Sequence, residues 1–283
     1  MAAITTGRAG RPAPIPARRR RADLTGTLRS EFTKIRSVRS TYWTLLVLVG
    51  ASVAWSVAFC AGEASRWPHM AAADRAGFDP TQSSVIGLAL LGQLVIVVLG
   101  VLSITSEYST GTIRTSLTVM PRRGVLYSAK AAVFAVVALA VAFLTSFAAF
   151  FVGQALLTST HAGAALSQPG VLRAVLGSAI YVSICGLFAF SLGAILRSTA
   201  GAMTAAYGLL FLVPQIARAL PGAWYADVAR WLPGPGVLTV ITSTNSQNNP
   251  PHLFSAWGEF AVFGSYTVIL LILGAALFRK RDA

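Results

Sequence analysis

The sequence has 283 residues, of which 55% are hydrophobic and only 11% are charged, and its mean hydropathy is +0.66. Soluble domains carry about 25% charged residues. Because this chain has too few charges to cover the surface of a soluble fold of its length, we expect an integral membrane protein. The net charge of +14 would first suggest a nucleic-acid partner, but the placement of the basic residues argues against one. Cys60 and Cys185 both lie in apolar runs, which favours buried free thiols over a disulfide.

Residues 1–22 contain no acid and no apolar run, and Pro12, Pro14 and Pro16 interrupt any helix. Such a segment cannot bury enough apolar surface to fold. We therefore expect a disordered basic cytoplasmic tail, with an organelle transit peptide as the alternative for an Arg-rich, acid-poor start.

Residues 23–40 have the pattern of an amphipathic helix. One face carries apolar residues at spacings of 4, 4 and 3, namely Leu24, Leu28, Phe32 and Ile35. Basic residues occupy the other faces, and an apolar run follows directly. This pattern predicts a helix that lies in the membrane interface; the alternative is an ordinary solvated helix packed on the protein's own body.

Six apolar segments follow, at about 41–60, 84–105, 129–153, 171–196, 200–217 and 257–278. Each is close to the roughly 20 residues that a helix needs to cross a 30 Å hydrocarbon core. The predicted fold is therefore an all-α integral membrane protein with six transmembrane helices, in which residues 23–283 form one domain.

The basic residues predict the orientation of these spans. If both termini are cytoplasmic, 18 Lys and Arg residues lie inside and 5 lie outside. This split follows the positive-inside rule. The basic excess is then explained by topology, and no nucleic-acid partner is needed.

The longest outer segment, residues 218–256, contains apolar pieces too short to span a membrane. They are interrupted by the Pro-Gly-Pro-Gly sequence at 233–236. Such a broken segment before the last span suits short helices that enter the membrane at about 219–242 and return. An aromatic-rich outer loop packed on the bundle explains the same pattern equally well.

The sequence contains no GxxxxGK[ST] loop for a nucleotide, no metal-ligand spacing and no recognisable catalytic arrangement. None of its nine acids falls at the centre of a predicted span. Ion-coupled transporters usually place ionisable groups at membrane depth, so a secondary transporter is disfavoured. If the protein carries out energy-driven transport, a partner must supply the energy.

The segment between the second and third spans is the candidate docking surface for that partner. Ile113, Leu117 and Met120 recur at helical spacing, and Pro121 ends the predicted helix of residues 106–121. A short amphipathic helix of this kind can insert into a groove on a soluble protein. A plain interfacial connector has the same periodicity.

Three stretches in this order carry a family resemblance: RSEFTKIRS before the first span, SEYSTGTIRTSL after the second, and PRRGVLYSAK leading into the third. They resemble the permease subunits of type-2 ABC transporters over about residues 24–283. The resemblance implies that the 106–123 loop contacts a separate ATPase. The candidate coupling residues are Glu107, Gly111, Thr112, Arg114, Leu117, Pro121, Arg122 and Lys130.

The resemblance also implies an ATPase subunit that binds ATP and Mg²⁺, so that this chain has no cofactor or metal of its own. It implies a dimer, with a second copy or a related permease, in a bacterial inner membrane among membrane lipids. The expected activity is export of an amphipathic or hydrophobic substrate, such as a drug, antibiotic, peptide or lipid-like molecule. The alternatives are an ATP-independent membrane-embedded enzyme or biogenesis factor, a secondary transporter, or a structural or sensory membrane protein.

Overall fold

The computed structural model of the protein describes residues 24–113, 118, 122–229, 231–232, 241–243 and 255–280. These ranges contain helices and no strand, as the composition predicted. The predicted tail, residues 1–22, lies outside the described residues, as do 114–117, 119–121 and most of 233–254.

Among the described residues, six helical stretches are long and apolar enough to cross a membrane, which confirms the predicted number of spans. The first is α2 (Arg39–Arg66), continued by η1 (Trp67–His69). The others are α4, η2 and α5 (Pro80–Gly87, Leu88–Gly92 and Gln93–Ser109), α7 (Arg123–Leu157) with η3 (Thr158–Thr160), α8 (Val171–Leu196), α9, η4 and α10 (Thr199–Tyr207, Gly208–Leu212 and Val213–Arg218), and α13 (Ala256–Lys280).

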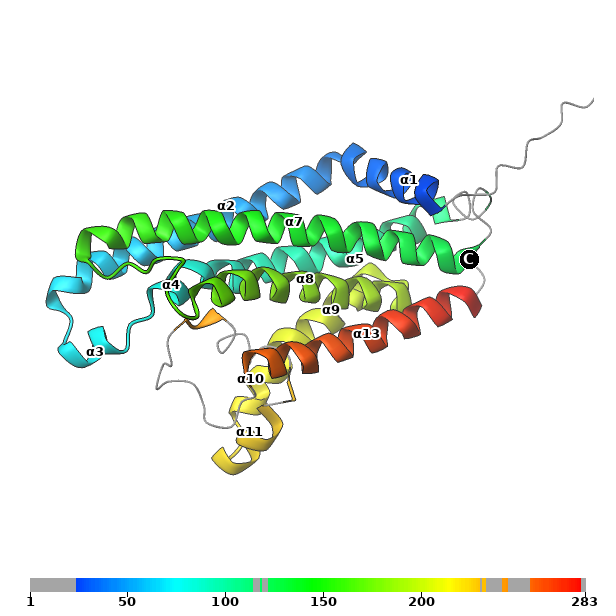
Figure 1. The fold of residues 1–283 in the computed structure, drawn as a ribbon. Helices are drawn as coiled ribbons and strands as arrows, with labels where there is room; N and C mark the ends of the chain where they lie inside the picture. Colours follow the sequence, from blue (N-terminus) through cyan, green and yellow to red (C-terminus); the bar gives the residue numbers. More distant parts are fainter. Residues whose placement is uncertain are drawn as a thin grey trace, which may run out of the picture.

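Among the described residues, the helices outside these spans include α1 (Leu24–Ser37), α3 (Ala72–Ala76) and α11 (Gly222–Ala229). The start of α1, the start of α7 and the end of α13 gather at one end of the bundle, while α3 lies at the other end (Figure 1). An even number of spans returns the chain to the side from which it started.

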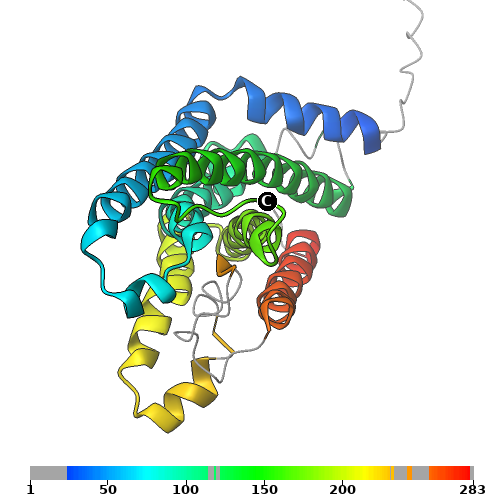
Figure 2. The same cartoon turned by 60° about the vertical axis from the view of Figure 1, so that its left-hand side comes forward.

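Helix α8 forms the centre of the bundle and is the most buried of the six spans. It packs against α5, α7, α9 and α13 (Figure 2). The contact between α8 and α5 is close because Gly100 on α5 faces the backbone of Gly186 on α8. Small residues allow such an approach between membrane helices.

Two spans contain one turn of π-helix, η2 in the second span and η4 in the fifth. In the fifth span the irregular turn directly precedes Pro214, which has no N–H to donate to the preceding turn. The helix therefore continues past Pro214 and ends at Arg218, one residue beyond the predicted span of 200–217.

Helix α7 is longer than its predicted apolar core of 129–153 and reaches from Arg123 to Leu157. At 1.5 Å per residue its 35 residues span about 50 Å, more than the hydrocarbon core of a membrane. Lys130 therefore lies inside a regular helix that begins at Arg123.

Both cysteines are free and buried, as expected. Cys60 lies 3.6 Å from the hydroxyl of Ser84, where either atom can donate.

At the end of the bundle that holds α3, Asp79 connects the loop after the first span to the segment before the last. Its Oδ1 accepts hydrogen bonds from the backbone N–H groups of Thr81 and Gln82 at 2.9 Å and caps α4. The same carboxylate accepts from the backbone N–H and hydroxyl of Ser243 at 2.7 and 2.9 Å. Arg173 holds the neighbouring Thr242 through its carbonyl oxygen at 2.7 Å. Part of the predicted broken outer segment is thus fixed to the bundle.

We expect Asp79→Ala to release this segment. The substitution removes the cap of α4, worth about 1 kcal/mol, and both hydrogen bonds to Ser243. Ile241, which is fully buried, should then become accessible. Maleimide labelling of an Ile241→Cys reporter measures that change, and Asp74→Ala, at an exposed acid of the same loop, is the matched control. Equal labelling in the two backgrounds would contradict the role of Asp79.

Candidate functional site

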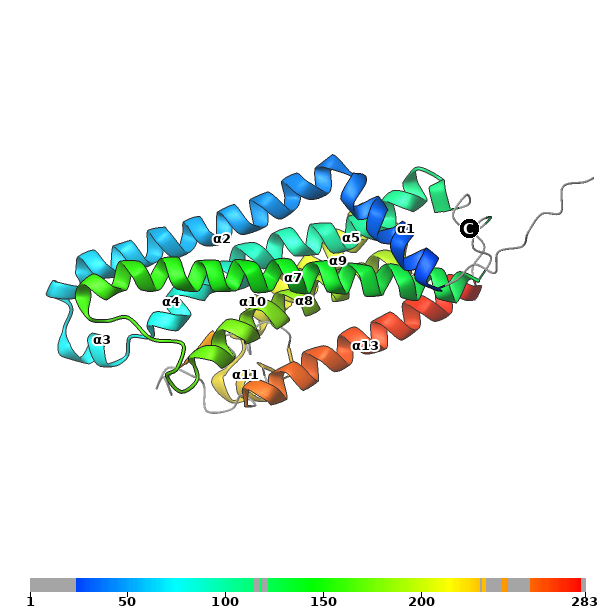
Figure 3. The ribbon, with the colours of Figure 1, turned by 45° about the horizontal axis from the view of Figure 1, so that its top comes forward.

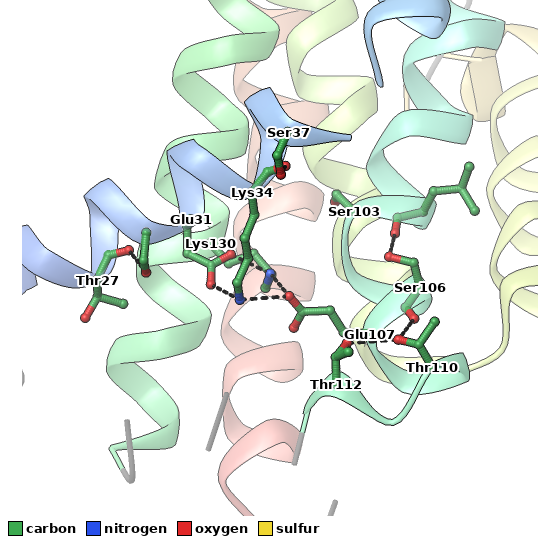
Figure 4. Close-up of polar contacts among 12 residues, drawn as sticks. Thr27, Glu31, Lys34, Ser37, Ser103, Ser106, Glu107, Thr110, Thr112 and Lys130 are labelled. Carbon is green, nitrogen blue, oxygen red and sulfur yellow. Dashed lines mark hydrogen bonds and ion pairs between the residues drawn. The ribbon is translucent and has the colours of Figure 1, made fainter. Parts of the chain in front are cut away.

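Four charged side chains from three helices meet at the end of the bundle where α1 crosses α7 (Figure 3). Glu31 and Lys34 lie on α1, Glu107 lies in the last turn of α5, and Lys130 lies near the start of α7. Figure 4 shows the four side chains pointing toward one another. We call this group the charge cluster.

Lys130 is the centre of the charge cluster. Its ammonium donates to Glu31 Oε2 at 2.6 Å and to Glu107 Oε1 at 2.7 Å. It is 6% exposed, while Glu31 and Glu107 are 2% and 9% exposed. Desolvation of such charges is costly unless they are paired, so this geometry ties α1 and α5 to α7.

Lys34 completes the cluster from its rim. Its ammonium lies 2.7 Å from Glu31 Oε1 and 3.2 Å from Glu107 Oε1. The side chain is 44% exposed, so this ammonium remains partly in contact with solvent. Each carboxylate therefore faces one buried and one half-exposed lysine.

Glu31 and Lys34, the two members of the charge cluster on α1, stabilise each other's charged forms. Burial raises the pKa of the Glu31 carboxyl, but the charges and hydrogen bonds of Lys130 and Lys34 outweigh burial and lower the pKa below its usual value. Burial lowers the pKa of Lys34, but its pairing with Glu31 and Glu107 outweighs this effect and raises the pKa. Both groups are charged at neutral pH.

The local sequence explains why α1 contributes its charges. Thr27 and Glu31, four residues apart, are buried against the bundle, whereas Phe32 is 50% exposed. Leu28 and Ile35 are half-buried; the side chain of Leu24 lies outside the described residues. The side of α1 that faces the protein is therefore polar, and the proposed contact of its apolar face with the membrane interface stays a prediction.

The predicted coupling residues fall into three groups. Glu107 and Lys130 are buried and paired with each other. Gly111, Thr112 and Arg122 are exposed beyond the charge cluster. The remaining three, Arg114, Leu117 and Pro121, lie outside the described residues.

The turn after α5 has its own local causes. Gly111 adopts a φ of +70°, a left-handed conformation that glycine adopts without steric cost. The hydroxyls of Thr110 and Thr112 lie 2.9 Å apart, and Thr110 also donates to the carbonyl of Ser106 at 2.8 Å. Ile113 then turns back into the core and is 3% exposed. The chain thus leaves α5 through a defined turn directly after Glu107.

Sequence reasoning missed Glu31 and Lys34 as site residues. Glu31 lies 99 positions from Lys130 in the chain. The periodicity of residues 23–40 identifies the apolar face of the helix and gives no information about its polar face. The available signal was a single acid in a basic helix, three residues before Lys34.

Residues 27–212 match the family model described as ABC-2 family transporter protein. The match covers well over half of the chain and includes all four residues of the charge cluster. The chain belongs to the ABC-2 transporter family. No curated protein matches the sequence.

Membership of the ABC-2 family confirms the resemblance to type-2 ABC permeases inferred from the sequence. Together with the six apolar helices it makes the protein a multi-pass membrane component of an ABC transporter. The family implies association with an ABC ATPase. The expectation of a transport component, and not of an enzyme, accords with this membership.

Proposed function

We propose that this ABC-2 protein is the permease subunit of an ATP-driven exporter in a bacterial inner membrane. Its substrate is amphipathic or hydrophobic, and the pathway is formed with a second copy or a related permease. A separate ATPase, which holds ATP and Mg²⁺, docks on the 106–123 loop. The observation that carries the proposal is the charge cluster, which joins the end of α5 to α1 and α7.

The structure suggests how the proposed coupling would divide among the candidate residues. Two exposed residues of the 106–123 loop, Thr112 and Arg122, are suited to contact the ATPase directly. Glu107 and Lys130 are buried, so we assign them the role of holding the turn to α1 and α7. A displacement of the loop would then move three helices together, because interactions of buried charges resist separation.

The docking assignment predicts that Arg122→Glu weakens association with the ATPase. Arg122 is exposed, so the charge reversal should leave the fold intact. The new negative charge should repel an ATPase surface that binds a basic loop. We expect about tenfold less ATPase to co-purify with the membrane-extracted protein, a factor that corresponds to about 1.4 kcal/mol. Arg66→Glu, at an exposed basic residue of the opposite end of α2, is the matched control.

Two outcomes would overturn the proposal. If the unaltered protein co-purifies with no ATPase, an ATP-independent membrane enzyme or biogenesis factor becomes the better interpretation. If Arg122→Glu and Arg66→Glu retain the same ATPase as the unaltered chain, the loop is not the docking surface. A bulky residue at Gly111, such as valine, tests the turn separately: its positive φ disfavours β-branched side chains, and we expect transport and ATP hydrolysis to become uncoupled.

A further inference from the structure

A cavity of about 600 Å³ lies beside the charge cluster, enclosed by α1, the start of α2, the end of α5 and the start of α7. Its size falls within the range of about 300–1,000 Å³ that is typical of small-molecule sites. Its apolar lining includes Leu99, Leu102 and Phe134, and its polar lining includes the two acids and two lysines of the charge cluster and a row of serine and threonine hydroxyl groups. The cavity is therefore amphipathic.

Five of the hydroxyl groups that line the cavity present acceptors to it. Each hydroxyl has one donor proton and two acceptor lone pairs. The protons are directed to backbone carbonyl oxygens of the same helices at 2.7–2.9 Å, in Ser37, Thr44, Ser103, Ser106 and Thr110. The lone pairs of these hydroxyl oxygens suit a ligand that donates hydrogen bonds.

The charged groups also favour a ligand that donates hydrogen bonds. Both lysine ammonium groups are already held by the two carboxylates. Glu107 Oε2 is buried and has no hydrogen-bond partner among the residues that the structure describes. The cluster thus has acceptor capacity left over at Glu107.

Lys34 and Lys130 differ in how readily a ligand can replace them. The Lys130 side chain is 7% exposed and bridges both carboxylates, whereas the Lys34 side chain is 44% exposed at the rim. A flexible lysine stem can carry its ammonium into solvent at low cost. An entering ammonium can then take the place of Lys34 between Glu31 and Glu107, while Lys130 stays.

We propose that this cavity binds a cationic amphiphile, a molecule with an aliphatic tail and a protonated primary amine. The tail packs on Leu99, Leu102 and Phe134. The ammonium donates to Glu107 and the hydroxyl row and displaces Lys34. Binding is a property of this chain alone and goes beyond the proposed export function, because it requires no ATPase.

The test uses the full chain in nanodiscs of zwitterionic lipid. The probe is a long-chain primary amine that carries a photo-activatable diazirine in its tail, and the matched probe is the carboxylate of the same length. We expect saturable cross-linking of the amine to α5 and α7, mapped by mass spectrometry, and at least tenfold weaker labelling by the carboxylate. Equal labelling by the two probes would overturn the proposal.

Three variants locate the site. Glu107→Gln should weaken amine binding at least about tenfold, since a charge-assisted hydrogen bond becomes a neutral one. Lys34→Met should strengthen amine binding because it removes the competing ammonium. Leu102→Trp fills the apolar end from a position that is 37% exposed, and it should abolish labelling without disturbing the charges. Glu63→Gln, on the other end of α2, is the control and should change nothing.

Each result decides the matter. If Leu102→Trp leaves labelling unchanged, the probe binds elsewhere and the site is wrong. If Lys34→Met weakens binding of the amine as much as Glu107→Gln does, Lys34 contributes to the ligand instead of competing with it, and the proposed exchange is wrong. Loss of ATPase docking in a separate experiment would affect only the proposed transport function.

Discussion

Lys130→Met should destabilise the protein by about 3–5 kcal/mol, the range found when one partner of a buried ion pair is removed. The substitution keeps the length of the side chain and removes only its charge. Glu31 and Glu107 lose their shortest contacts, at 2.6 and 2.7 Å, and both carboxylates stay buried. The half-exposed Lys34 cannot compensate both.

We expect this loss as a lower thermal midpoint in detergent and as detachment of α1. Maleimide labelling of a Thr27→Cys reporter detects the second effect, because Thr27 is 7% exposed in the packed helix. Lys34→Met is the matched control: its side chain is 44% exposed, so its ion pairs are screened by solvent and contribute about 1 kcal/mol or less.

A double variant separates the charge effect from simple loss of packing. In Lys130→Met/Glu107→Gln, one of the two unpaired carboxylates is replaced by a neutral amide. Removal of both partners costs less than removal of one, so the double variant should be more stable than Lys130→Met alone. If it is less stable by the sum of both single effects, the residues do not act as a pair.

The spans could be predicted because each lies within one continuous stretch of sequence. Hydropathy over about 20 residues locates a membrane helix without knowledge of its neighbours. The predicted core at 171–196 coincides with α8. The long α7 shows the limit of the method, because residues 123–128 continue the helix before the predicted apolar core.

The charge cluster could be predicted only in part. Glu107 and Lys130 were selected through the family resemblance, and they lie 23 positions apart. Their partner Glu31 comes from a helix whose periodicity drew attention to its apolar face. Pairing across such a distance depends on how α1 crosses α7, and a pattern within α1 does not encode that crossing.

The contact of Asp79 with Ser243 could not be predicted from the sequence for the same reason. The two residues are separated by 164 positions, and the sequence around each indicates only a helix cap and a loop. The sequence therefore fits both interpretations of the outer segment, as short helices that enter the membrane and as a loop packed on the bundle. The structure places Ile241, Thr242 and Ser243 against the bundle, and the apolar residues just before them lie outside the described residues.

Gly100→Ala is the second substitution with a large expected effect. An added Cβ at this position would collide with the carbonyl oxygen of Gly186, which belongs to the backbone of α8. Backbone cannot move aside as a flexible side chain can, so α5 and α8 must separate along the most buried contact of the bundle. Overpacking of this kind costs about 1–3 kcal/mol, and we expect the upper part of that range.

Gly264→Ala on α13 is the matched control, because an added Cβ there meets no atom within 4 Å. In a helix, alanine is favoured over glycine by about 0.5–1 kcal/mol, so this variant should be as stable as the unaltered protein or slightly more stable. Thermal unfolding of the two variants in the same detergent gives the comparison. Equal midpoints would show that α5 and α8 do not meet at Gly100, and a packing explanation for this glycine would fail. A lower midpoint for Gly100→Ala alone would establish that the centre of this ABC-2 bundle depends on a direct backbone contact between two spans.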